Sequence, residues 1–368
     1  MTSADRTGAM GPMRIGTPRR ERAVLCLAAQ AACLTAILCG CSARDRQLEL
    51  RGVALGTTYT VKVIVPRQGD TPRGDWRTAV DEALDDVDAK MSTYRDDSEI
   101  SRFNASTDTT PFQVSEDTVD VLLEARQVWE ATGGAFDVTV APLVNAWGFG
   151  PDGTVAALPS DTELAELRQR VGFQYIEIDS AGSTIRKIRP DVSCDLAAIA
   201  KGYAVDRVAL GVERAGYTRY MVEVGGEVRT HGFNVRGTPW QVAIEKPLTD
   251  TRAIEVVVPL ASLAMATSGD YRNYYEKDGI RYSHTIDPRT GRPIAHKLAS
   301  ASVIHTECAM ADAYATALMV LGPNAGYDLA VGRYLAALFI VREDDGTFAE
   351  KQTPAFETLV SAGKGDSH

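Results

Sequence analysis

The sequence predicts an α+β fold in which mixed or antiparallel sheets pack against helices. Helical and strand-like segments occur in runs rather than in strict alternation, which disfavours a parallel sheet built from βαβ units. No internal repeat is visible, and no linker after residue 50 is long enough to require a domain boundary. We therefore expect one domain over residues 51–360 and a disordered tail over residues 361–368.

Four helices are expected in the first two thirds of the chain. Their apolar residues recur at helical spacing, and several begin at a capping residue, such as Ser115 or the Ser160–Glu163 capping box. Gly133, Gly172 and Gly216 provide stop signals. The expected helices are residues 75–94, 115–134, 160–172 and 195–216.

Strand signals dominate later in the chain, although an early strand is expected over residues 56–65, which are rich in β-branched side chains. Two hairpins are expected, one around Gly225-Gly226 and one around the "KDG" turn at residues 277–279. A helix over residues 308–322 precedes a late strand. The later strand-like segments are residues 220–232, 240–247, 253–260, 271–288 and 336–343.

The composition is that of an ordinary globular protein. The chain has 368 residues, of which 45% are hydrophobic and 24% are charged. The formal net charge of -10 gives a nucleic-acid-binding role no support. An anionic ligand is still compatible with an acidic protein, because local charges decide binding.

The N-terminus has the pattern of an export signal. Residues 1–22 are rich in arginine, and residues 23–40 carry no charge. The run ends in "LCGC", which resembles the lipobox of bacterial lipoproteins, where the last cysteine is lipidated after cleavage. We expect a signal peptide over residues 1–40, lipidation at Cys41 and a tether over residues 41–50. The alternative is an uncleaved membrane anchor.

The helix over residues 308–322 poses an electrostatic question. Asp312 is its one charged side chain, and burying a lone carboxylate is costly unless something pairs with it. Thr316 lies four residues later and therefore on the same face. A carboxylate and a hydroxyl at this spacing suit Mg²⁺, which prefers oxygen ligands. The alternative is an Asp312 that is satisfied by backbone donors or by a buried arginine.

Other polar residues are ambiguous taken singly. Lys201 lies among small side chains and either reaches the surface or neutralises a phosphate. Asp137 is either a turn residue or an acceptor for a heterocycle. Tyr94 is either a surface residue or a stacking face. His284 has polar neighbours and is the best candidate for a general base.

Taken together, these motifs are far more specific. The chain contains "LGTTYTVKV", "STYRDDSEISRFN", "TGGAFDVTVAPLVNAWGFG", "DLAAIAKGYAVD", "GGEV", "ATSGDYRNY", "SHTIDPRTGRP" and "ADAYATALMVLG" in this order. The set closely resembles the FAD:protein FMN transferases of the ApbE type, from about Gly52 onward. The resemblance implies a T-fold-like architecture and Mg²⁺-dependent transfer of FMN from FAD to a threonine or serine hydroxyl of a target protein, with release of AMP.

The resemblance also implies roles for individual residues. Mg²⁺ would be held by Asp312, Thr316 and the backbone carbonyl of Ala198, and His284 would deprotonate the acceptor hydroxyl. Leu55 stands where the family often has methionine, a substitution of similar size. The residues expected to contact FAD are Leu55, Tyr94, Ala135, Phe136, Asp137, Asp195, Lys201 and Ile286.

Two alternatives to a transferase stay open from the sequence. Water attacking in place of the hydroxyl would make the protein an FAD pyrophosphatase, and loss of catalysis would leave a flavin-binding lipoprotein. For a transferase, the family suggests an exported redox-pump or electron-transfer subunit as the acceptor, on the periplasmic side of whichever membrane holds the lipid anchor. A disulfide between Cys194 and Cys308 is a further hypothesis that export would permit.

Overall fold

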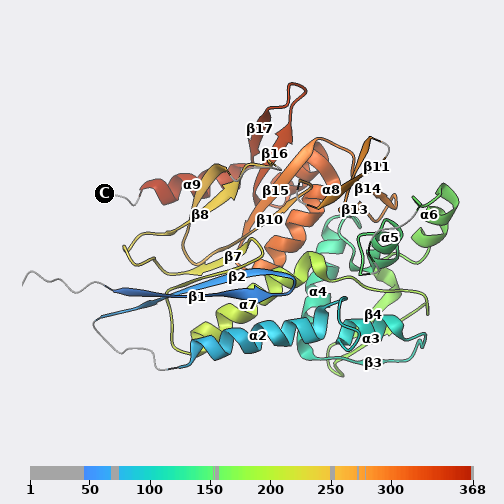
Figure 1. The fold of residues 1–368 in the computed structure, drawn as a ribbon, viewed down its shortest axis with the longest axis horizontal. Helices are drawn as coiled ribbons and strands as arrows, with labels where there is room; N and C mark the ends of the chain where they lie inside the picture. Colours follow the sequence, from blue (N-terminus) through green and yellow to red (C-terminus); the bar gives the residue numbers. More distant parts are fainter. Residues whose placement is uncertain are drawn as a thin grey trace, which may run out of the picture. The chain divides into compact units, whose positions relative to one another are not determined.

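An eight-stranded sheet organises the part of the chain that the structure describes (Figure 1). The structure is a computed structural model that describes residues 45–365, apart from 68–73, 152, 154–156, 249–252, 272 and 278. All neighbouring strands of the large sheet are antiparallel. In sheet order they are β1 (Arg46–Ala54), β2 (Thr57–Val65), β6 (Tyr220–Val224), β7 (Glu227–His231), β10 (Ala264–Gly269), β15 (Leu298–His305), β16 (Ala336–Arg342) and β17 (Phe348–Gln352).

Smaller antiparallel sheets surround the large one. Both expected hairpins are confirmed, since β6 pairs with β7 and β11 pairs with β12. The strands of the smaller sheets are β3 (Phe112–Gln113), β4 (Ile176–Asp179), β5 (Thr184–Lys187), β8 (Trp240–Glu245), β9 (Ile254–Leu260), β11 (Tyr274–Lys277), β12 (Ile280–Ser283), β13 (Ile286–Asp287) and β14 (Arg292–Pro293).

The helices agree with the predicted α+β class. The side chains of Ser115 and Ser160 each accept a hydrogen bond from the backbone N–H of the residue three positions later, as their capping role predicts. The α-helices are α2 (Trp76–Met91), α3 (Glu99–Ala105), α4 (Glu116–Ala131), α5 (Ala141–Ala146), α6 (Asp161–Arg168), α7 (Ala197–Arg214), α8 (Cys308–Gly332) and α9 (Pro354–Gly365). Two 3₁₀ turns are η1 (Val138–Val140) and η2 (Phe173–Tyr175).

The large sheet is buried on both faces near its centre. On β15, Val303 belongs to the main core with α2, α7 and α8, whereas Ile304 points to a second core with α9 and the β8–β9 hairpin. Side chains alternate between the two faces of a strand. Because a core covers each face here, every residue of β15 except His305 is buried. This central strand therefore supports α8, the helix that carries Asp312.

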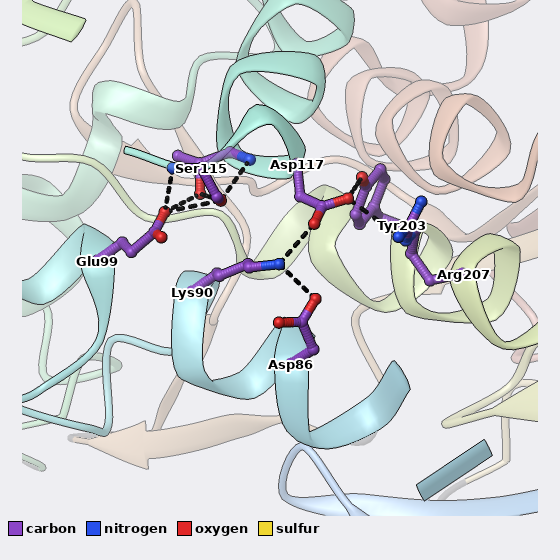
Figure 2. Close-up of polar contacts among 8 residues, drawn as sticks. Asp86, Lys90, Glu99, Ser115, Asp117, Tyr203 and Arg207 are labelled. Carbon is purple, nitrogen blue, oxygen red and sulfur yellow. Dashed lines mark hydrogen bonds and ion pairs between the residues drawn. The ribbon is translucent and has the colours of Figure 1, made fainter. Parts of the chain in front are cut away.

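A charged network joins α7 to α2 and α4 (Figure 2). Asp117 accepts the Tyr203 hydroxyl at 2.6 Å and pairs with Lys90 at 2.5 Å and with Arg207 at 3.3 Å. Tyr203 is two residues beyond Lys201, about 200° further round the helix. The network thus holds α7 with Lys201 directed away from it.

Three expected boundaries are corrected. β1 begins at Arg46, inside the expected tether of residues 41–50, because it forms a complete ladder with β2. α9 continues to Gly365, into the expected disordered tail. α7 begins at Ala197, two residues after the expected start at residue 195.

Several predictions concern residues outside the described part. The signal peptide over residues 1–40, lipidation at Cys41 and the first residues of the tether lie there. Among the described residues, none of the helices is both long enough and apolar enough to cross a bilayer.

Candidate active site

The candidate site is centred on the contact between α7 and α8. The backbone N–H of Gly202 on α7 donates to Oδ2 of Asp312 on α8 at 3.1 Å. A Cβ at Gly202 would lie 2.4 Å from the Cys308 carbonyl oxygen, so only glycine permits this approach. The small residues of the two helices therefore serve close packing, which brings Asp312 against the turn that follows Ala198.

Lys201 is shared between two buried carboxylates. Its Nζ lies 3.0 Å from Oε1 of Glu227 and 3.5 Å from Oδ2 of Asp312. Burial alone would lower the pKa of Lys201, but the two carboxylates outweigh it and raise that pKa. Burial raises the pKa of Asp312, against the effect of Lys201. Burial likewise raises the pKa of Glu227, to about 7. A cation that entered this group would relieve its excess negative charge.

The oxygen donors around Asp312 fit Mg²⁺. The Gly202 N–H, which lies one helical turn after Ala198, donates to Asp312. Thr316 is one turn beyond Asp312, and its hydroxyl lies 3.1 Å from that of Ser268 on β10. Among the described residues, no three His, Cys, Asp or Glu side chains form a metal cluster. The candidate ligands are oxygen atoms and would fill only part of a coordination shell. This suits Mg²⁺, which usually keeps water and phosphate oxygens as further ligands.

His284 has one ring nitrogen committed and one available. Its Nδ1 lies 2.9 Å from the Asn273 carbonyl, which can only accept, so Nδ1 carries the proton and Nε2 is left to act as a base. Burial is the main reason that the pKa of His284 is lowered, with a further contribution from the charge of Lys201. The imidazole is therefore poised in its neutral form.

Two of the segments predicted to bind FAD lie together. The Asp195 N–H donates to the Val138 carbonyl at 2.7 Å, which joins the start of α7 to η1. Asp137 is buried and both of its carboxylate oxygens are occupied, by Thr139 and by the N–H of Phe173. The structure thus gives Asp137 a role in holding this segment, along with the buried Ala135 and Phe136.

The remaining predicted FAD contacts are dispersed. Leu55 occupies the β1–β2 turn with a φ of 52°. Tyr94 is 73% exposed and offers an open ring face. Ile286 is buried in a small cluster with Leu143 and Trp147, so its side chain serves packing. No described hydrogen bond, ion pair or ring contact joins these three side chains to Asp312.

Sequence reasoning missed Glu227. It lies within the motif "GGEV", but nothing local indicates that this glutamate faces Lys201. The available signal was an acidic residue directly after the Gly225-Gly226 turn, at the start of a strand.

Comparison with known proteins decides the family. The sequence model described as the ApbE family matches residues 55–339. The chain belongs to the ApbE family. The match includes every predicted flavin and metal residue from Leu55 to Thr316.

Members of the ApbE family cover most of this chain. The FAD:protein FMN transferase of Vibrio cholerae is 44% identical over 88% of this chain and 96% of its own length. That of Salmonella typhimurium is 38% identical over 91% of this chain and 98% of its own length. The solved flavin transferase ApbE from Vibrio cholerae has a TM-score of 0.78 at 43% identity, covering 86% of this chain and 99% of that one. The apbe protein from Thermotoga maritima has a TM-score of 0.74 at 30% identity, covering 86% and 99%.

Proposed function

We propose that this protein transfers FMN from FAD to a threonine or serine hydroxyl of a target protein and releases AMP. Its family and the names of its relatives support this reaction. The observation that carries the proposal is the arrangement at the α7–α8 contact, where Lys201 pairs with Asp312 at 3.5 Å. A cation site and an ammonium side by side suit a diphosphate substrate, because phosphoryl transfer depends on positioning and charge neutralisation.

In the proposed reaction, His284 Nε2 accepts the proton of the acceptor hydroxyl. The hydroxyl oxygen forms a bond to the phosphorus of the FMN half, and the bond from that phosphorus to the bridging oxygen breaks. AMP leaves with the electron pair of this bond. The Lys201 ammonium offsets negative charge on the diphosphate, as a lysine can do when it lies close to phosphate oxygens.

The proposed metal is Mg²⁺, held by Asp312, Thr316 and the Ala198 carbonyl. When bound, Mg²⁺ would polarise the diphosphate and stabilise the charge on the leaving phosphate. Its proposed ligands are all oxygen atoms, as Mg²⁺ prefers, and the Gly202 N–H holds Asp312 beside the turn that follows Ala198.

The proposed location is the periplasmic side of a cell membrane, with the lipid on Cys41. The basic and apolar order of residues 1–40 and the "LCGC" sequence support this location. The proposed acceptor is an exported subunit of a redox pump or electron-transfer complex, because such a protein would share the compartment.

The deciding experiment incubates the protein with FAD, Mg²⁺ and an exported electron-transfer subunit that has an available threonine. Intact-mass analysis should show one added FMN on that threonine, and none after metal chelation. Asp312→Asn preserves the shape of the side chain and should abolish metal-dependent transfer in a folded protein. Free FMN and AMP with an unmodified acceptor would instead identify an FAD pyrophosphatase.

A further inference from the structure

Glu227 is a buried carboxylate with one oxygen unused. It is 3% exposed, and its Oε2 has no hydrogen-bond partner among the described residues. It begins β7, directly after the Gly225-Gly226 turn that joins β7 to β6. Leaving a buried carboxylate oxygen unpaired costs free energy, so this arrangement needs a reason other than stability.

The partner of its other oxygen is Lys201. The Lys201 ammonium lies nearer to Glu227, at 3.0 Å, than to Asp312, at 3.5 Å. Glu227 comes from the sheet, whereas Lys201 and Asp312 come from two packed helices. The ion pair with Glu227 thus ties the Lys201 ammonium to the sheet as well as to α8.

These contacts place Lys201 in competition with a metal ion for Asp312. A cation that binds Asp312 must displace or weaken the Lys201–Asp312 pair, since both interactions use the same carboxylate. Lys201 then keeps Glu227 as its partner, and its partly exposed side chain stays beside the metal. Without the charge of Glu227, the Lys201–Asp312 pair would be stronger. Mg²⁺ would then bind Asp312 more weakly.

We propose that Glu227 is a positioning residue that draws Lys201 away from Asp312, so that Asp312 can bind Mg²⁺ while the ammonium is kept for the FAD diphosphate. The proposal rests on the proposed function and assigns Glu227 no contact with the reacting atoms. The effect of Glu227 should accordingly act through Lys201.

The test is a double-mutant cycle on the full chain, using wild type, Glu227→Gln, Lys201→Met and the double variant. Flavin fluorescence measures FAD binding as Mg²⁺ is titrated. In Glu227→Gln we expect the half-saturating Mg²⁺ concentration to rise by about tenfold, with most of this rise absent from the Lys201→Met background. A rise of equal size in both backgrounds, or no rise, would overturn the proposal.

Two further variants serve as a control and as a replacement in this test. Glu223→Gln alters the same hairpin but not the Lys201 pair, since Glu223 accepts the Gly226 N–H; it should leave the Mg²⁺ dependence at the wild-type value. If thermal denaturation shows Glu227→Gln to be unfolded, Glu227→Asp replaces it in the cycle, because a shorter carboxylate keeps the charge but weakens its hold on Lys201. Its half-saturating Mg²⁺ concentration should lie between the wild-type value and the about tenfold higher value expected when the carboxylate is lost. An unchanged value would again overturn the proposal.

The two proposals fail in different ways. If wild type binds FAD with Mg²⁺ but transfers no FMN, the proposed function fails while the cycle can still be read from binding. If wild type transfers FMN and the cycle shows no coupling between Glu227 and Lys201, the positioning role alone is wrong.

Discussion

At the scale of single residues, His284 shows how a neutral base is prepared. The Asn273 carbonyl binds the Nδ1 proton, which leaves Nε2 as the acceptor. Burial and the nearby Lys201 both disfavour the imidazolium, so the pKa of His284 lies below 6.5 despite the opposing effect of the hydrogen bond that His284 donates to the Asn273 carbonyl. The residue is thus available as a base across the neutral range.

This shift predicts the acidic limb of the pH–rate profile. The neutral imidazole is the active form, so activity should be retained as pH falls to 6.5 and be lost only as pH falls through the lowered pKa of His284. Transfer measured by intact mass at saturating FAD would check this. His284→Ala should bind FAD normally and transfer FMN about 100-fold or more slowly. A limb above 6.5 that persists in His284→Ala would exclude this histidine as the base.

At the scale of elements, the approach of α7 to α8 depends on Gly202. Gly202→Ala would place a Cβ 2.4 Å from the Cys308 carbonyl, and such overpacking costs about 1–3 kcal/mol. We expect a lower free energy of unfolding in denaturant titrations. Gly332→Ala is the matched control, because its Cβ would meet no atom within 4 Å; it should be neutral or stabilising by up to about 1 kcal/mol. Equal effects of the two variants would contradict close packing at Gly202.

The kink in α8 has an identifiable cause. Gly322 has a φ of 79° and Pro323 follows it inside the helix, so Pro323 has no N–H for the Met319 carbonyl. His296 Nε2 lies 2.8 Å from that carbonyl, and its Nδ1 accepts the Leu298 N–H. The side chain therefore replaces the missing backbone donor.

This replacement predicts a cost for removing the His296 ring. His296→Ala leaves the buried Met319 carbonyl without that donor and should lower the free energy of unfolding by about 1–3 kcal/mol. His296→Gln retains an N–H donor and should recover part of the loss. Thermal and denaturant unfolding of the two variants would measure the difference, and an alanine variant as stable as wild type would show that water satisfies the carbonyl.

At the scale of the whole molecule, the sequence predicts what is encoded locally. The caps at Ser115 and Ser160 depend on neighbouring residues, so the starts of α4 and α6 were predictable. β1 was not, because its residues are largely exposed and become a strand through pairing with β2.

The candidate site divides in the same way. The shared face of Asp312 and Thr316 follows from helical spacing, whereas the contact of Lys201 with Glu227 exists only because β7 lies beside α7. Long-range packing of this kind leaves no periodic signal in the sequence.

The two core cysteines provide a probe of this packing across the molecule. The hypothesis of a Cys194–Cys308 disulfide is wrong for this structure, since both thiols are free and 0% exposed. Burial raises the pKa of Cys194 to about 12, and the thiolate is the reactive form. Thiol reagents should therefore label the two peptides only at the rate at which the core opens. Peptide mapping without reductant should find both thiols unmodified before unfolding and labelled together in denaturant. A disulfide-linked peptide, or fast labelling of one cysteine alone, would contradict a core that opens as one unit.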